Sequence, residues 1–162
     1  MFLIPGSWGR REVGPDAASE SSAPNRQVPP PHVPIPPDCY FLDLPGYGYA
    51  RASKADRTAF AGLVRHVLHR PRLVGVVWLL DIRHEPSEGD RGMQDLFAGA
   101  GTRVLAAVTK SDKLSSAQRG VREMALRQAL ALDEDQLVVT SVRTGFGLPE
   151  LREAIAALVR GT

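Results

Sequence analysis

From residue 38 onward, the hydrophobic and polar positions alternate between two patterns. Short, unbroken apolar runs are separated by longer stretches in which apolar residues recur every three or four positions. The first pattern is typical of strands that are covered on both faces, and the second of amphipathic helices. Their alternation predicts the βα units of a mostly parallel sheet, and therefore an α/β fold.

The apolar runs predict four strands, at residues 39–42, 73–82, 103–109 and 136–141. The first of these runs ends at Asp43. The longest run, at 73–82, is shorter than the ~20 apolar residues that a bilayer requires. No membrane-spanning segment is therefore expected.

Polar caps and prolines mark the helices between these runs. Ser53 followed by Asp56 is typical of a helix start, and Pro149 is well placed as the first residue of the last helix. We expect helices at about 54–69, 90–98 and 116–132, and a closing helix from 149. In the third of these helices, Val121 and Met124 are predicted to face the core.

The first 37 residues differ in composition from the rest of the chain. Most of the thirteen prolines precede Asp38, and consecutive prolines there disfavour helix and central strand. We therefore predict a disordered, Pro-rich segment at 1–37 and one folded domain at 38–162. A chain of 162 residues is long enough for one domain with a core of its own.

Composition and charge narrow the possible functions only a little. Twenty Lys and Arg residues against eighteen Asp and Glu leave a net charge of +2, so no large cationic field indicates nucleic-acid binding. The single cysteine, Cys39, has no second thiol for a disulfide or a CxxC motif. This usage fits the reducing cytoplasm, where we expect the protein to be a monomer.

The first candidate motif is Asp43-Leu44-Pro45-Gly46, which has the form DxxG and follows the first apolar run. In a nucleotide switch the aspartate holds Mg²⁺ through a water, and the glycine N–H approaches a γ-phosphate because no Cβ stands in the way. Taken alone, a strand end of this kind is more often an ordinary turn.

The second motif is Thr109-Lys110-Ser111-Asp112, of the form [NT]KxD, directly after a buried run. A carboxylate at this point can accept hydrogen bonds from both N1–H and the exocyclic amine of guanine, which discriminates between bases by about 1–3 kcal/mol. The lysine stem can lie over the base plane, and the threonine hydroxyl can tie the loop to its neighbour. Taken alone, the motif is also compatible with a polar strand end that leads into a helix.

The third motif is Thr140-Ser141-Val142, which a glycine-containing loop follows. Here a backbone N–H would meet the guanine O6, so the side chains are loosely constrained. Each motif stands at the carboxyl end of a predicted strand, where an open parallel sheet places its ligand. Their order, spacing and strand context together indicate a GTP site.

Three strings make this interpretation specific to a family. They are Asp43-Leu44-Pro45-Gly46-Tyr47-Gly48-Tyr49-Ala50, Leu80-Asp81-Ile82-Arg83-His84 and Thr109-Lys110-Ser111-Asp112-Lys113-Leu114. With them, residues 38–159 resemble the EngB (YihA/YsxC) family of bacterial GTP-binding proteins. The resemblance implies a TRAFAC-class GTPase with a three-layer P-loop NTPase-like domain, here a partial G domain.

The same resemblance implies ligands, a partner and site residues. The ligands are GTP or GDP with Mg²⁺, which Asp43 contacts through a water, and the partner is a precursor of the large ribosomal subunit. The implied role is ribosome assembly, with cell division and septation as the older description. The implied GTP-binding residues are Asp43, Leu44, Pro45, Gly46, Thr109, Lys110, Ser111, Asp112, Thr140, Ser141 and Val142, and switch II contains Tyr47, Gly48 and Tyr49.

No residue is assigned a catalytic role. Tyr47 stands where many small GTPases have the glutamine that orients the attacking water, and a phenol suits that task poorly, so slow hydrolysis is expected. The loop at 47–49 could equally be a contact surface. Asp81, Arg83 and His84 are expected to cap a strand and orient the following loop.

The P-loop that should open such a domain does not occur in this sequence. The family begins with a strand that leads into GxxxxGK[ST], and the chain contains no Gly-Lys pair. The segment at 2–10 has the wrong glycine spacing, and the segment at 21–27 echoes switch I without its threonines. The β-phosphate contacts and the hydroxyl that binds Mg²⁺ are therefore expected to be missing.

The missing strand should also affect the fold. It would lie between the strand that ends at Asp43 and the one that ends at Ile82, and each buried backbone group left unpaired costs about 1–3 kcal/mol. We predict a marginal or rearranged fold, unless residues 1–37 or a partner chain fill the position.

An EngB-type protein could also be read here from a start that is too late, with its P-loop encoded upstream. Two interpretations other than an EngB-type GTP-binding protein remain open. The chain could be a nucleotide-independent interaction module that docks on ribosomal RNA or protein through the same surfaces. An unrelated doubly wound enzyme is the third possibility, although no nucleophile, carboxylate pair or metal-ligand cluster stands out.

Overall fold

The structure is a computed structural model that describes residues 2–5, 39–46 and 54–161. Its strands are β1 (Phe2–Pro5), β2 (Leu42–Asp43), β3 (Leu73–Asp81), β4 (Val104–Thr109) and β5 (Leu137–Val139). Its helices are α1 (Lys54–Leu68), α2 (Glu88–Gly99), α3 (Ser116–Ala129) and α4 (Leu148–Arg160), with short 3₁₀ turns η1 (Ser111–Lys113) and η2 (Glu134–Gln136).

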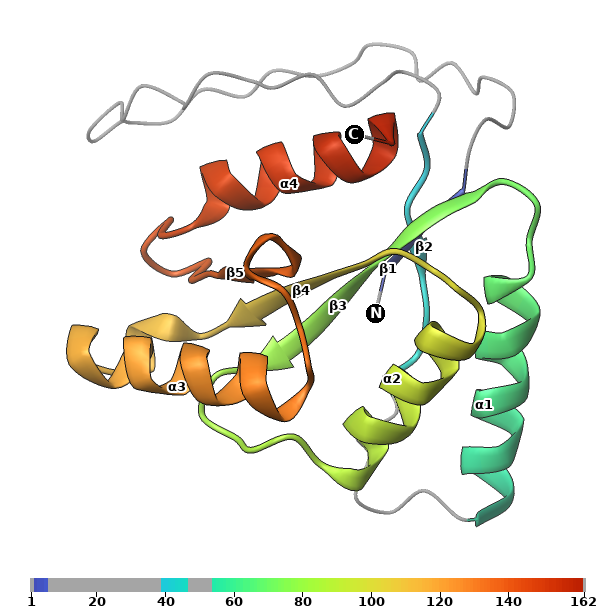
Figure 1. Cartoon of the computed structure of the whole chain (residues 1–162), viewed down its shortest axis with the longest axis horizontal. Helices are drawn as coiled ribbons and strands as arrows, with labels where there is room; N and C mark the ends of the chain where they lie inside the picture. Colours follow the sequence, from blue (N-terminus) through green and yellow to red (C-terminus); the bar gives the residue numbers. More distant parts are fainter. Residues whose placement is uncertain (1, 6–38, 47–53, 162) are drawn as a thin grey trace, which may run out of the picture.

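The strands form one sheet in the order β2-β1-β3-β4-β5. The strands β3, β4 and β5 are parallel, and their register places Asp81 opposite Thr109. Helix α4 covers one face of the sheet, whereas α1, α2 and α3 lie on the other (Figure 1). The predicted three-layer α/β fold with a mostly parallel sheet is therefore confirmed.

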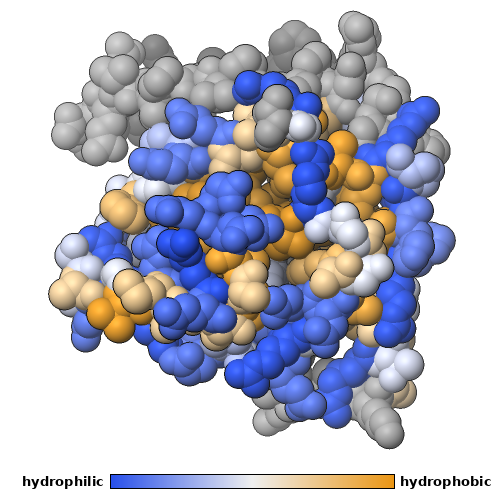
Figure 2. Space-filling model, viewed as in Figure 1, coloured by the Kyte–Doolittle hydropathy of each residue, from blue (hydrophilic) through white to orange (hydrophobic). Residues whose placement is uncertain are grey.

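Alternating residues of β3 divide the core between these two faces. Trp78 and its even-numbered neighbours pack with the layer of α1, α2 and α3, where Trp78 meets Phe97 edge-to-face at 5.5 Å between ring centroids. Val77 faces α4 and packs with Ile155. Leu79 lies on the same face as Val77 but is 39% exposed, because α4 covers only part of this face. Apolar side chains are visible between α4 and the lower helices in Figure 2.

The strand β1 occupies the position between β2 and β3, which the sequence predicts to be a gap unless residues 1–37 or a partner chain fill it. It runs antiparallel to both neighbours, with Leu3 opposite Leu42 and Val76. This corrects the expectation of disorder for Phe2–Pro5, since the exposed ladders of β2 and β3 give this short segment backbone partners. The rest of the predicted Pro-rich segment, residue 1 and residues 6–37, lies outside the described residues, as do Asp38, Tyr47, Gly48 and Tyr49.

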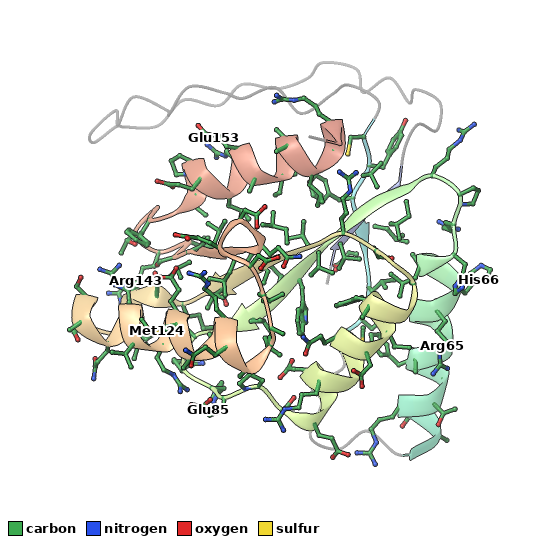
Figure 3. All side chains as sticks on the ribbon, in the orientation of Figure 1. Arg65, His66, Glu85, Met124, Arg143 and Glu153 are labelled. Carbon is green, nitrogen blue, oxygen red and sulfur yellow. The ribbon has the colours of Figure 1, made fainter. Side chains whose placement is uncertain are left out.

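Helix α3 presents a different face to the sheet from the predicted one. Val121 and Met124 are 69% and 63% exposed, whereas Leu126 is buried. Arg122 lies on the inward side, where Nε donates to the Ile82 carbonyl at 3.2 Å and Nη2 to the Arg83 carbonyl at 3.1 Å. These bonds attach α3 to the loop after β3, a constraint that hydrophobic periodicity does not reveal. Met124 is labelled on α3 in Figure 3.

Serine side chains cap two of the helices, whereas Ser53, which the sequence predicts at the start of α1, lies outside the described residues. Ser115 caps α3 in a capping box with Gln118, and Ser87 caps α2 in the same way with Asp90. The box at Ser87 starts α2 two residues earlier than the predicted 90. Within the described ranges, every helix is too short or too polar to cross a membrane.

Candidate functional site

The carboxyl ends of β3, β4 and β5 lie along the same edge of the sheet (Figure 1). The loops at 82–87, 110–115 and 140–147 follow these ends. Glu85 and Arg143, on the first and the third of these loops, both lie on this side of the molecule in Figure 3. Two of the three predicted motifs therefore meet at one edge, as the sequence predicts for an open parallel sheet.

The segment Thr109–Asp112 is held between its two neighbouring strand ends. Thr109 Oγ1 donates a hydrogen bond to the Leu80 carbonyl at 2.9 Å, and the Ser111 N–H donates to the Thr140 carbonyl at 3.1 Å. Lys110 has a φ of 63°, a left-handed conformation that costs a non-glycine residue on the order of 1 kcal/mol. The chain turns sharply at this residue, and η1 begins immediately after it.

Asp112 is a nearly buried carboxylate of this edge with only one of its two oxygens hydrogen-bonded. Its side chain is 9% exposed, and its Oδ1 accepts a 2.7 Å hydrogen bond from Ser141 Oγ. Its Oδ2 is buried and has no hydrogen-bond partner among the described residues. The nearest cations, Lys113 Nζ at 3.8 Å and Arg143 Nη1 at 3.7 Å, are too distant for a hydrogen bond.

The surroundings of Asp112 keep it ionised. The hydrogen bond from Ser141 lowers the pKa of this carboxyl below its usual value, and the nearby Lys113 and Arg143 lower it further. A buried acceptor without a donor costs about 1–3 kcal/mol, and more when it is charged. Asp112 Oδ2 is therefore an acceptor to which a ligand with N–H donors can bind favourably.

The loop that follows β5 holds Ser141 in place. Ser141 is fully buried, its N–H donates to the Phe146 carbonyl at 2.9 Å, and its carbonyl accepts from the Gly145 N–H at 2.9 Å. Gly147 has a φ of 70°, and a Cβ there would collide with the Val139 carbonyl oxygen. Val142, the residue after Ser141, is 83% exposed.

Asp81 links Lys110 to the end of the neighbouring strand. Lys110 Nζ lies 2.8 Å from Asp81 Oδ2, and Arg83 binds the same carboxylate through Nε at 2.9 Å and Nη2 at 2.7 Å. The Arg83 hydrogen bonds, followed by those of Lys110, hold the pKa of Asp81 well below its usual range, although burial opposes them. The sequence placed Asp81 at a strand end, but its contact with Lys110 spans 29 residues and was not predicted.

A cavity of about 450 Å³ joins this cluster to the first motif. Gly46 and Asp81 both line it, together with His84 and Ser87. Leu44 is buried in the core, whereas Asp43, Pro45 and Gly46 are exposed. The cavity brings Gly46 beside the end of β3, but a Cβ on Gly46 would meet no described atom within 4 Å.

The polar side chains of this edge fit a guanine base better than they fit a metal ion. Asp112 offers a buried, unpartnered acceptor next to Ser141, which suits a base with adjacent N–H donors. Among residues 2–5, 39–46 and 54–161, no three His, Cys, Asp or Glu side chains are placed to hold a metal. Asp43, which is exposed, is the carboxylate that the DxxG motif would provide for Mg²⁺.

The fold defines the class of protein to which the chain belongs. It is similar to the elongation factor SelB of Methanococcus maripaludis, with a TM-score of 0.54 and 20% identity over 75% of this chain and 25% of that one. It is also similar to the FeoB G-domain of Methanococcus jannaschii, with a TM-score of 0.52 and 21% identity over 75% and 73% of the two chains. The fold is therefore that of a P-loop GTPase domain.

Curated relatives specify the family within that class. The chain is 46% identical over 118 residues to the probable GTP-binding protein EngB of Gemmatimonas aurantiaca, and 39% identical over 143 residues to that of Syntrophomonas wolfei. These matches cover 72% and 88% of this chain, and 58% and 74% of the relatives. No family model matches the chain. The chain belongs to the EngB family of GTP-binding proteins, and it spans little more than half of the first of these relatives.

Proposed function

We propose that this chain binds the guanine base of GTP or GDP at the carboxyl edge of β4 and β5. The observation that carries the proposal is Asp112, whose Oδ2 is buried, ionised and without a described hydrogen-bond partner. Its other oxygen is already fixed by Ser141, so the carboxylate is oriented before a ligand arrives. Preorganisation of this kind reduces the entropy lost on binding.

In the proposed complex, guanine donates from N1–H and from its exocyclic amine to the carboxylate of Asp112. Adenine presents no such pair of donors, so the aspartate would discriminate between the two bases by about 1–3 kcal/mol. The stem of Lys110 would lie along the base plane, and the Val142 N–H would meet O6. Thr109, Ser111 and Thr140 would hold the two loops together through the bonds described above.

The phosphates would contribute less than in a GTPase that has a P-loop. Gly46 would approach a γ-phosphate from the cavity beside Asp81, with Leu44 and Pro45 shaping the turn and Asp43 reaching Mg²⁺ through a water. The sequence has no Gly-Lys pair to hold the β-phosphate. We therefore expect GTP, GDP and guanosine to bind with similar affinities, and hydrolysis to be slow.

The wider role that we propose rests on the resemblance to the family. It comprises assembly of the large ribosomal subunit in the cytoplasm, cell division and septation, with switch II residues Tyr47, Gly48 and Tyr49 and a precursor of that subunit as the partner. The relatives from Gemmatimonas aurantiaca and Syntrophomonas wolfei are probable GTP-binding proteins, which supports guanine-nucleotide binding.

A second candidate is a nucleotide-independent interaction module. The exposed apolar side chains of Val121, Met124, Val142 and Phe146, on α3 and the loop after β5, favour this function. The two functions differ in whether the Asp112 carboxylate has a ligand.

The test is titration calorimetry of the full chain with guanosine, GDP and xanthosine, for the wild type and for Asp112→Asn. Xanthine carries a carbonyl where guanine has its amine, so an amide that donates should suit it better. We expect Asp112→Asn to weaken guanosine binding at least tenfold and to improve xanthosine binding. Asp135→Asn, at the opposite end of β5, is the matched control. Equal affinity of wild type and Asp112→Asn for guanosine would exclude the proposed site.

A further inference from the structure

Lys110 and Asp81 come from neighbouring parallel strands whose ends are aligned. The register places Asp81 opposite Thr109, the residue before Lys110. Because Lys110 has a φ of 63°, the chain turns there, and its Nζ reaches Asp81 Oδ2 at 2.8 Å. The lysine side chain therefore crosses from the end of β4 to the end of β3.

Asp81 is held in place independently of Lys110. Its Oδ1 accepts from the Arg83 N–H at 3.0 Å and from Nε at 2.9 Å, and its Oδ2 accepts from Nη2 at 2.7 Å. A paired guanidinium–carboxylate contact of this kind has a fixed geometry. The Asp81 side chain is 19% exposed, against 53% for Lys110. The more buried aspartate is thus the fixed partner, and the lysine is the residue whose position it determines.

We propose that Asp81 is a positioning residue for guanine binding. It holds the stem of Lys110 along one side of the proposed base site at Asp112. The inference rests on the proposed function, because Lys110 stands two positions before the base-reading Asp112. Without the carboxylate at position 81, the four methylene groups of the lysine lose their fixed end and sample several rotamers. Guanine binding then has to order that side chain.

A purely structural role for Asp81 predicts a different outcome. Asp81 also shapes the loop after β3, because its carboxylate accepts from the Arg83 N–H and its carbonyl accepts from the His84 N–H at 3.1 Å. If that were its only role, its loss would lower the unfolding temperature, and its effect on binding would not depend on Lys110. The coupling between positions 81 and 110 separates the two roles.

The experiment is a double-mutant cycle on the full chain, read by calorimetric titration with GDP. Its variants are Asp81→Asn, Lys110→Met and the double variant, and methionine keeps an unbranched stem without the ammonium. We expect Asp81→Asn to weaken GDP binding about two- to fivefold, the range for a partly exposed ion pair. In the Lys110→Met background the same change should have no further effect.

The matched cycle replaces Lys113 by methionine, because its Nζ pairs with Asp112 rather than with Asp81. There the effects of Asp81→Asn and Lys113→Met should multiply. The binding loss in Asp81→Asn should also shrink at high salt, since ions screen the partly exposed contact in the wild type. Unfolding temperatures of all variants identify any loss of fold, and Lys110→Met tests the same contact from its exposed side if Asp81→Asn fails to fold.

The outcomes distinguish this inference from the proposed function. Suppose that the wild type binds GDP. If Asp81→Asn then binds GDP with the wild-type affinity, or if the effects of the changes at 81 and 110 multiply, the positioning role alone is overturned. A wild-type chain that does not bind GDP overturns both proposals. Coupling between 81 and 110 without coupling between 81 and 113 supports the positioning role.

Discussion

Ser141 Oγ donates a 2.7 Å hydrogen bond to Asp112 Oδ1, across 29 positions of sequence and between the ends of two neighbouring strands. This bond leaves the other carboxylate oxygen buried and available to a ligand. The base-binding end of the candidate site is thus assembled by the loops after β4 and β5 together, and neither loop contains it alone.

Replacement of Ser141 by alanine should weaken guanosine binding without loss of the fold. A hydrogen bond to a charged group contributes about 1.5–3 kcal/mol, so we expect the affinity to fall roughly tenfold or more. The pKa of Asp112 should rise toward its usual value, because the bond that lowers it is removed. Calorimetry measures the first effect, and carboxyl NMR the second.

Ser116→Ala is the matched control, since Ser116 is exposed on the first turn of α3 and lies outside the site. We expect it to bind guanosine like the wild type. If Ser141→Ala retained full affinity and an unchanged Asp112 pKa, the hydrogen bond would have no role in binding.

The pH dependence of stability should reflect Asp81. Its pKa is lowered in the folded protein, first by Arg83 and then by Lys110, so its contribution to stability is complete above the unfolded value of about 3.9. That contribution is lost as the pH falls from there through the folded pKa. The difference in unfolding free energy between wild type and Asp81→Asn should therefore be constant from about pH 6 to 8, because Asp81 and its cationic partners stay charged throughout that window.

Urea unfolding at a series of pH values measures this difference. We expect it to decrease only below about pH 4. Asp135→Asn, which removes an exposed carboxylate far from Arg83 in the sequence, is the matched control. A difference that already changes between pH 6 and 8 would show that another group controls it.

The strand β1 should be needed for the stability of the sheet. Leu3 lies inside β1, opposite Leu42 and Val76, so its backbone belongs to a ladder between two strands. Leu3→Pro removes an N–H donor from a central strand, and we expect a loss of about 1–3 kcal/mol or more in unfolding free energy.

Leu3→Ala is the control for this prediction, because it keeps the backbone donor. The relevant quantity is the difference between the two variants in urea unfolding. Equal stability of Leu3→Pro and Leu3→Ala would mean that the sheet does not depend on β1.

Two glycines of the loop after β5 offer a matched pair of substitutions. Gly145 and Gly147 have similar left-handed φ values of 78° and 70°. A Cβ at Gly145 meets no described atom within 4 Å, whereas one at Gly147 collides with the Val139 carbonyl oxygen. Gly145→Ala should therefore cost about 1 kcal/mol for the conformation alone, and Gly147→Ala considerably more.

The same pair should differ in guanosine binding, since displacement of Gly147 moves the loop that holds Ser141. We expect Gly145→Ala to bind almost like the wild type and Gly147→Ala to bind weakly. Thermal unfolding and calorimetry of both variants check these expectations. Similar losses in the two variants would indicate that the left-handed backbone conformation, rather than the close approach to Val139, explains the loss of stability and binding.

Much of the fold followed from local patterns. The unbroken apolar runs predicted β3, β4 and β5. The expected starts at 116 and 149 lie within one residue of the observed starts of α3 and α4. The errors came where two elements interact. Helix α3 was predicted to bury Val121 and Met124, but Arg122 binds carbonyls after β3 and turns Leu126 to the core instead.

By itself, the sequence determined the order of the strands and helices, the three motifs at strand ends and the absence of a Gly-Lys pair, because these depend on residues close together in the chain. Only the tertiary structure decided that Phe2–Pro5 enter the sheet antiparallel, that Lys110 binds Asp81 and that Ser141 orients Asp112. Hydrophobic periodicity shows which face of an element is buried. Which partner that face meets depends on backbone ladders and charges from distant parts of the chain.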